Sequence, residues 1–239
     1  MKELFRKSLS IWCLYAALLG GAGAQSLDNY GFVRFVNLVE AGQGNLKASI
    51  AGNDLKKRGF ELGERSFPIP LPSGNHELRV AREGCMPSVL TIEVSAGKTQ
   101  AVFARSVPEF GDDGELLRWW IRLVPVEHAS RGDERGVTFL SFSKIDPLPV
   151  RIERQNAPTI FVNLKRNDAQ WIEVPFTGNP AGFFSGENQL TEAIPDREGQ
   201  HVLIVFDQGE DGKLGSVFYR DVAFSFDSSR LTPGNLTEE

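Results

Sequence analysis

The sequence predicts an all-β protein with two small antiparallel β-sandwich domains, immunoglobulin- or transthyretin-like, in tandem after a signal peptide. Residues 90–94 and 150–153 alternate apolar and polar side chains, which is typical of a strand with one buried face. Turn-forming residues recur between such segments about every 8–12 residues, a spacing that indicates a sandwich or barrel. Beyond residue 27, no segment carries a convincing apolar stripe at helical spacing over three turns.

The first 24 residues have the pattern of a signal peptide. Lys2, Arg6 and Lys7 form a basic start, residues 9–19 are apolar, and residues 22–24 are the small residues Ala-Gly-Ala. Signal peptidase recognises small residues in this position. We therefore expect cleavage after residue 24 and export to the periplasm or the medium.

Two other interpretations of this N-terminal segment are less consistent with its residues. A membrane anchor needs about 20 predominantly apolar residues, and this apolar run is shorter. A lipoprotein would carry its lipid on Cys13, but the bulky Trp12 stands where lipid attachment requires a small residue. No later segment is long and apolar enough to span a membrane.

Cleavage would leave an acidic chain with a single thiol. It would remove three basic residues and one acidic residue, which changes the formal net charge from −5 to −7. Nucleic acid and anionic lipid surfaces are therefore poor candidate partners. Cys85 would be the one remaining cysteine, so no internal disulfide can form and packing must stabilise the fold.

The strands expected from residue 25 onward fall into two groups. The segments 76–80, 90–94, 150–153 and 222–226 alternate, whereas 32–38 and 201–206 are nearly continuous apolar runs that predict interior strands. Turns are predicted at 72–75, 96–98, 113–114, 178–180 and 211–212, where Gly, Pro, Asn and Asp gather. A short helix at 115–119 is a weaker alternative for that segment.

A polar run divides the chain into halves of ordinary domain size. We expect a first β-sandwich at 25–126, a linker at 127–136, a second β-sandwich at 137–226 and a flexible tail at 227–239. Each half opens with a similar strand, at 32–36 and at 137–141, which favours a duplicated sandwich.

The first half carries the motifs of a known family. Residues 69–80 join a Pro-Ser-Gly turn to a strand, residues 83–87 (Glu-Gly-Cys-Met-Pro) form a corner, and residues 91–99 form a strand that ends in Ala-Gly-Lys. Over about residues 67–104 the chain resembles PEGA-type and related exported bacterial β-sandwich domains. It departs from them in lacking the naming tetrad and in having Cys85 in place of an aromatic residue. The resemblance implies a non-catalytic module of the bacterial envelope.

No metal or cofactor is expected. His76, His128 and His201 are scattered, and no cysteine pair accompanies them, so the pattern of a zinc site is missing. Two acidic loops, 112–115 and 207–212, are candidates for calcium. The second has oxygen ligands on alternate residues but lacks the Glu that closes a calcium loop, so we interpret it as a hairpin turn.

Catalytic motifs are also missing from the sequence. There is no Gly-x-Ser-x-Gly elbow, no glycine-rich phosphate loop and no distinctive carboxylate pair. Cys85 has no histidine nearby in the sequence and is interpreted as a small buried hydrophobic residue. We therefore expect a protein that is not an enzyme.

Aromatic residues are the remaining candidates for binding. If Trp119 and Trp120 lie on one strand, their side chains must point to opposite faces. Arg122 shares the face of Trp120 and favours water, so we expect Trp119 in the core and Trp120 as a ligand platform. Trp171 is a further aromatic residue without such an assignment.

Three functions remain open, in order of preference. The first is a non-enzymatic exported envelope protein that acts as a scaffold or protein-binding module. The second is a carbohydrate-binding protein that uses an exposed tryptophan, since aromatic rings stack on sugars. The third is a hydrolase whose site is assembled only by the fold. The partner, an envelope protein or polysaccharide, cannot be named from the sequence.

Overall fold

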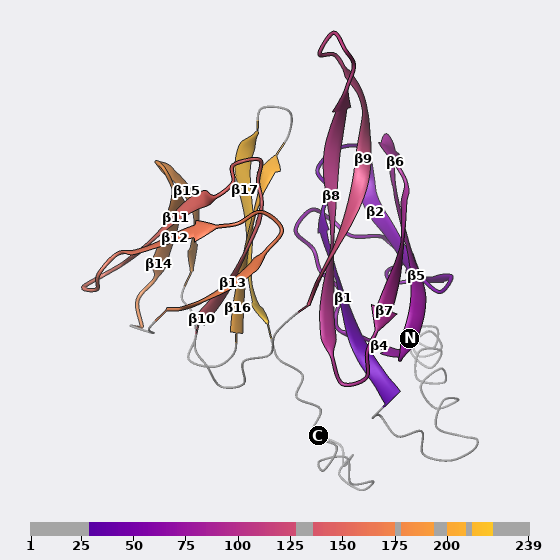
Figure 1. Ribbon diagram of the computed structural model, residues 1–239, viewed down its shortest axis with the longest axis horizontal. Helices are drawn as coiled ribbons and strands as arrows, with labels where there is room; N and C mark the ends of the chain where they lie inside the picture. The colour runs from indigo at the N-terminus through magenta and orange to yellow at the C-terminus, as the bar shows by residue number, and fades with distance from the viewer. Residues whose placement is uncertain (1–28, 128–135, 175–177, 194–199, 209–211, 222–239) are drawn as a thin grey trace, which may run out of the picture.

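The computed structural model describes residues 29–127, 136–174, 178–193, 200–208 and 212–221 (Figure 1). This part of the chain is built almost entirely of strands and confirms the all-β class. The predicted signal peptide, most of the predicted linker, the predicted strand at 222–226 and the tail lie outside the described residues. Within them, no helix has the length and apolarity needed to cross a membrane.

The strands form four sheets. Those of the first half are β1 (Tyr30–Leu38), β2 (Gln43–Ile50), β3 (Asn53–Asp54), β4 (Ile69–Pro72), β5 (Gly74–Glu83), β6 (Cys85–Met86), β7 (Ser88–Val94), β8 (Thr99–Phe110) and β9 (Leu116–Glu127). Those of the second half are β10 (Gly136–Phe142), β11 (Leu148–Arg154), β12 (Ile160–Leu164), β13 (Ala169–Glu173), β14 (Ala181–Ser185), β15 (Asn188–Ala193), β16 (Gln200–Gln208) and β17 (Lys213–Asp221).

The two halves repeat the same strand order. The inner sheets read β4-β1-β8-β9-β6 and β13-β10-β16-β17, and the outer sheets read β3-β2-β5-β7 and β12-β11-β14-β15. Directions match too, because β1 and β10 each pair with one antiparallel neighbour (β4 or β13) and one parallel neighbour (β8 or β16). The similar opening strands of the sequence are thus topological counterparts. Only β6 has no counterpart among the described strands.

Each half buries a core between its inner and outer sheets. The first contains Val33, Phe35, Leu46, Leu78, Ile92 and Val102, among others. The second contains Val137, Phe139, Leu148, Val150, Phe183 and Leu203, among others. The alternating strands β5, β7 and β11 place one face in these cores, as their patterns predict.

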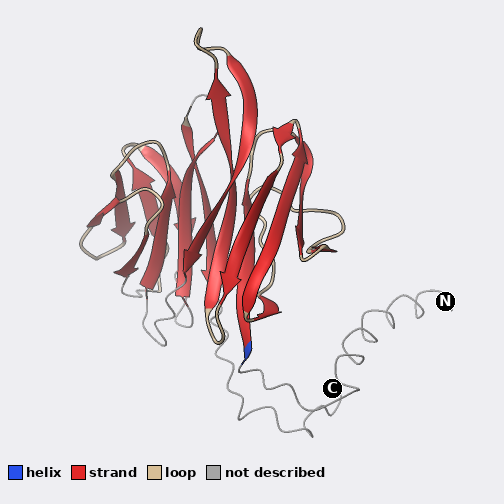
Figure 2. Ribbon diagram, turned by 45° about the vertical axis from the view of Figure 1, so that its right-hand side comes forward, coloured by secondary structure: helices blue, strands red, loops and turns tan. Residues whose placement is uncertain are grey.

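A third core joins the halves and was not expected from the sequence. The other faces of the two inner sheets contribute Val36, Leu38, Ala101, Phe103, Leu140, Phe142, Val202, Ile204 and Phe206. The rings of Phe103 and Phe142 meet across this contact at 5.3 Å. Strands β1, β10 and β16 and the lower part of β8 are therefore buried on both faces, and the sheets stack as four layers (Figures 1 and 2).

The predicted turns lie where strands meet. Gly97, between β7 and β8, has φ +71°, and Gly114, between β8 and β9, has φ +81°. These values lie in the left-handed region, which glycine adopts without steric cost. Gly114 lies at the tip of a long hairpin, and the residues from 116 onward belong to strand β9. The weaker alternative of a helix at 115–119 is therefore wrong.

A buried polar residue occupies the same place in both inner sheets. Asn37 on β1 accepts the Val39 N–H through Oδ1 at 2.8 Å, and Ser141 on β10 accepts the Ser143 N–H through Oγ at 3.4 Å. Both side chains are fully buried. Asn37 also donates through Nδ2 to the carbonyl oxygens of Phe60 and Glu61, each at 3.0 Å. The two residues are counterparts, but Asn37 also binds the loop between β3 and β4.

Candidate functional site

The hairpin β8–β9 extends past the rest of the molecule (Figures 1 and 2). Residues that pair directly across antiparallel strands share a face. On the face that includes Phe103 and Val124, the lower part is covered by the second half. The same face continues upward beyond this contact. We call its uncovered part, formed by Val107, Glu109, Arg118 and Trp120, the hairpin face.

Trp120 is held in a fixed position on the hairpin face. Its Nε1 donates to a carboxylate oxygen of Glu109 at 2.6 Å, and the same carboxylate pairs with Arg118 at 3.0 Å. The Arg118 guanidinium lies 5.9 Å from the centre of the Trp120 ring. The residue is nevertheless 40% exposed. Such an ordered, exposed aromatic residue loses little conformational entropy when it binds a partner.

Other exposed apolar residues lie on this hairpin and on the neighbouring strand β6. Met86 on β6 is the register partner of Trp120, and Phe110 and Leu117 lie near the tip. Leu117 is 56% exposed. Of the nine large hydrophobic residues exposed in the described part of the chain, Met86, Phe110, Leu117 and Trp120 all lie on this hairpin or its neighbour β6. This is the main concentration of accessible apolar surface there.

Trp119 differs from its expected environment. It lies on β9 with Trp120, as predicted, but it is half-buried and belongs to none of the three cores. The expectation that it is a core residue is therefore wrong. On its side of β9 the buried residues of the first core end at Ile121, and Trp119 pairs with Cys85 of β6 at the edge of that core.

The other residues singled out in the sequence lie apart from this hairpin face. Trp171 on β13 is half-buried, and its ring lies over Gly136. His201 is buried and stacks on Phe218 at 5.5 Å. Cys85 is half-buried, donates to the Ala41 carbonyl oxygen at 3.2 Å and packs on the first core. Burial raises the pKa of this thiol, although Arg82 opposes the effect.

The two acidic loops are described to different extents. The loop 112–115 is the tip of the hairpin, where Asp113 accepts the Glu115 N–H at 3.0 Å. The loop 207–212 includes residues outside the described part. No group of three or more His, Cys, Asp or Glu side chains there is arranged to hold a metal ion.

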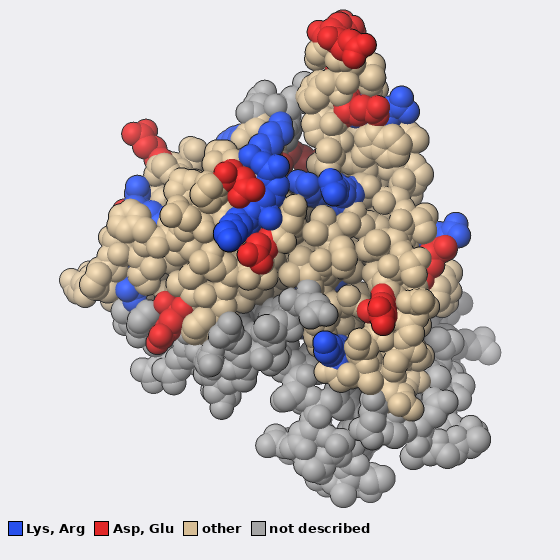
Figure 3. Space-filling model, in the orientation of Figure 1, with Lys and Arg blue, Asp and Glu red and all other residues tan. Residues whose placement is uncertain are grey.

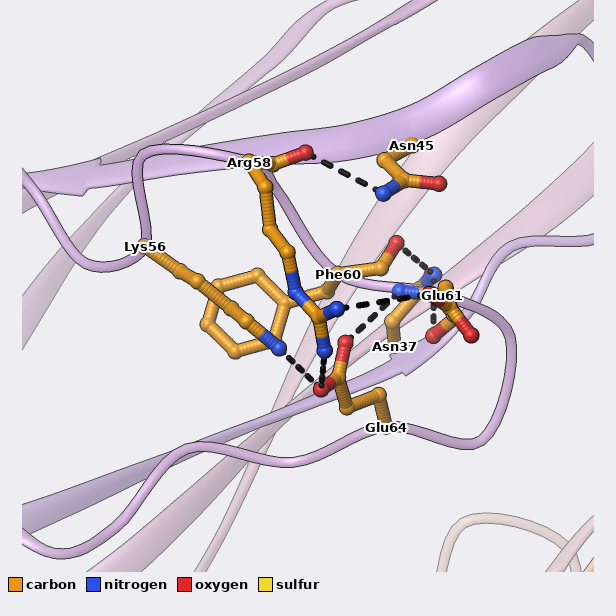
Figure 4. Close-up of polar contacts among 7 residues, drawn as sticks. All are labelled: Asn37, Asn45, Lys56, Arg58, Phe60, Glu61 and Glu64. Carbon is orange, nitrogen blue, oxygen red and sulfur yellow. Dashed lines mark hydrogen bonds and ion pairs between the residues drawn. The ribbon is translucent and has the colours of Figure 1, made fainter.

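A second polar cluster, in the loop between β3 and β4, is occupied by its own contacts (Figure 4). The Glu64 carboxylate accepts from the Lys56 ammonium, from Arg58 at 3.1 Å and from the Glu61 N–H at 3.0 Å. These bonds, led by the one from Lys56, lower the pKa of Glu64 to about 2. Phe60 beneath them is buried. The cluster therefore closes the first core and presents no vacant partner to a ligand.

A third feature is a cleft of about 180 Å³ where β8 meets the ends of β10 and β16. Residues from both halves line it, including Arg105, Phe142, Lys144, Arg166 and Asp207. We call it the junction cleft. In Figure 3, lysine and arginine side chains gather along the line where the two halves meet. No sequence signal pointed to it, since its lining residues extend from Leu38 to Asp207 in the chain.

Comparison with models of known protein families and with characterised proteins found no match to this chain. The resemblance of residues 67–104 to PEGA-type domains thus stays a prediction.

Proposed function

We propose that the protein is a non-enzymatic exported envelope protein that binds a protein partner through the hairpin face. The observation that carries the proposal is that one face of the β8–β9 hairpin is buried along its lower part and exposed along its upper part. Below Arg105 this face packs against the second half, and above it Trp120 is exposed. Phe110 and Leu117 are also exposed, near the tip of the same hairpin. Exposed apolar patches of this kind mark interaction surfaces in soluble proteins.

The chemistry of the hairpin face fits a protein partner. Interface hot spots are enriched in Trp and Arg, and Trp120 and Arg118 lie side by side here. The Glu109 carboxylate fixes both, so the surface is ordered before binding. A preorganised surface retains more of its interaction energy as affinity.

We further propose that each half is a transthyretin-like sandwich. In the immunoglobulin constant-type arrangement the first two strands lie in one sheet. Here β1 and β2 lie in different sheets, as do β10 and β11. This difference favours the transthyretin-like alternative over the immunoglobulin-like one for both halves.

Site-specific photocrosslinking in intact producing cells would test the binding surface. A benzophenone side chain at Leu117 is expected to give a discrete protein adduct, which Trp120→Ala should weaken. The matched control is the same probe at Phe161, which is 77% exposed on β12 of the second half. Equal labelling from both positions, or no adduct from Leu117, would contradict the proposal.

Carbohydrate binding is the second candidate, because Trp120 combines an exposed ring with the adjacent Glu109 carboxylate. Calorimetric titration with soluble oligosaccharides would distinguish it from protein binding. Saturable heat that disappears in Trp120→Ala would favour a sugar ligand. The Arg118 guanidinium near the ring makes a protein partner the better fit.

Export is tested separately by the intact mass of the protein recovered from the envelope or medium. We expect a chain that begins at Gln25. Full-length protein recovered from the cytoplasm would exclude the predicted cleavage.

A further inference from the structure

The junction cleft contains an unusual concentration of positive charge for an acidic protein. Arg105, Lys144 and Arg166 line it, and Arg122 stands opposite Arg105 in the β8–β9 register. The carboxylate within the cleft is Asp207. Its two oxygens accept the Ser143 hydroxyl at 2.8 Å and the Lys144 N–H at 2.7 Å, so it organises the loop after β10.

Some of these cations have structural roles that hold them in place. Arg166 donates through Nε to the Ser143 carbonyl oxygen at 2.7 Å and through a terminal nitrogen to that of Lys144. Its backbone N–H is bound by Asp146 at 3.2 Å. Arg105 donates from one terminal nitrogen to the Phe142 carbonyl oxygen at 3.1 Å. Both guanidinium groups are therefore fixed by carbonyl oxygens, which do not neutralise them.

Other donors remain without a partner. The Nε of Arg105 is buried and has no hydrogen-bond acceptor. The side chains of Arg122 and Lys144 form no ion pair or hydrogen bond within the described part of the chain. Burial lowers the pKa of Arg105, and the charges of Arg122 and Arg166 lower it further, while Asp207 opposes them.

A bound anion would reduce the unfavourable concentration of positive charge in the junction cleft. Arg105 is partly removed from water without a carboxylate bound to it, which is unfavourable for a cation. The neighbouring charges of Arg122 and Arg166 add to the cost. Oxyanions accept several charge-assisted hydrogen bonds from arginine at once. A volume of about 180 Å³ also far exceeds the ~10–15 Å³ needed for one water molecule.

We propose that the junction cleft binds a small oxyanion, a phosphoryl, sulfate or carboxylate group, through Arg105, Arg122 and Lys144. This inference does not rest on the hairpin face having a partner. The anion would lie where the two halves meet and would contact strands from both. Its binding would therefore stabilise their contact as well as the local charges.

Calorimetric titration of the purified protein with sodium phosphate, at ionic strength held constant with chloride, would test the site. We expect saturable binding, and at least about tenfold weaker binding in each of Lys144→Ala and Arg122→Gln. Both side chains are exposed or unpaired, so these variants are expected to fold. Lys57→Ala, which removes an exposed cation outside the cleft, is the matched control and should bind as the original protein does.

Two further arms identify the source of the anion and separate this site from the hairpin face. Tighter binding of glycerol 3-phosphate than of phosphate would place the group on a larger molecule, and tighter binding of acetate would identify a carboxylate. Trp120→Ala should retain phosphate binding even if it loses a protein partner. No saturable binding of any of these anions above the chloride background, or an equal loss in Lys57→Ala, would overturn the proposal.

Discussion

The two halves of the molecule share a strand order but differ at the upper end of their inner sheets. In the first half β8 and β9 have twelve residues each, whereas their counterparts β16 and β17 have nine each. Strand register pairs Leu38 with Arg105 and Phe142 with Phe206, which makes Arg105 the counterpart of Phe206. At this position the first half has a charged residue and a long hairpin. The second half has an apolar ring and a shorter hairpin.

This difference separates what the fold requires from what it merely permits. The apolar residues of the three cores and the buried polar positions recur in both halves, so they are required for packing. The hairpin extension and Arg105 occur in the first half alone among the described residues. Features that one copy of a repeated topology lacks are not needed for that topology, which is why we assign recognition to them.

The largest expected effect tests whether the halves fold together. Replacing Phe103 with Ala should lower the free energy of unfolding by about 3–5 kcal/mol, the usual cost of emptying a buried aromatic site. Because the third core draws on both halves, urea denaturation should still show one transition, with Trp171 reporting the second half. A second-half transition unchanged by the substitution would show that the halves are independent. Phe161→Ala, at an exposed site, should cost less than about 0.5 kcal/mol.

The paired positions Asn37 and Ser141 give the next largest effect. Asn37→Ala would remove three hydrogen bonds and leave the Val39 N–H without its acceptor, at a cost of about 2–3 kcal/mol. The carbonyl oxygens of Phe60 and Glu61 would keep their backbone N–H donors. Ser141→Ala would remove one longer hydrogen bond and should cost about 1 kcal/mol. Chemical denaturation of both variants measures the difference. Equal losses of unfolding free energy in the two variants would mean that the loop contacts of Asn37 contribute nothing to stability.

Glu64, in the first half, makes the free energy of unfolding depend on pH. Its pKa is lowered in the folded state to about 2, so its contribution is complete above its unfolded pKa of ~4.3. It is lost as the pH falls from there toward 2. Discounted for partial exposure, Glu64→Gln should cost about 1 kcal/mol at neutral pH and almost nothing near pH 2. Thermal melts of both proteins across this range measure the effect, and parallel curves would argue against it.

Shortening the hairpin should have the smallest effect on stability. Glu109 and Arg118 are register partners, so an Asn-Gly turn in place of residues 110–117 would join them with a two-residue loop. Because Phe110 and Leu117 are exposed, the loss should be below about 1 kcal/mol, measured by denaturation. Binding at the hairpin face should weaken at the same time. A large loss of stability would mean that the extension belongs to the fold.

Local patterns were sufficient to predict individual strands. The alternation at 76–80 and 90–94 lies in β5 and β7, and the apolar runs at 32–38 and 201–206 lie in β1 and β16. Period-two alternation depends only on one face being buried, so it is visible in a single segment. The assignment of Trp119 and Trp120 to opposite faces of one strand followed from the same periodicity.

Long-range packing could not be predicted in this way. The apolar runs indicated burial on both faces but not that the second cover would come from the other half of the chain. The environment of Trp119 depended on how far β9 extends past the first core, which no local pattern encodes. The cations Arg105 and Arg166 meet only because the two halves dock, so their proximity is a property of the tertiary structure.

The third core has one more consequence, for how such a molecule can evolve. In a dimer of identical subunits, one substitution changes both sides of the symmetric contact. Here the contact between Phe103 and Phe142 has Ile204 and Leu38 in the corresponding positions, so the two sides differ in sequence. Because both halves belong to one chain, their association does not weaken on dilution. A covalent pair can therefore keep one copy for stability while the other acquires a new surface.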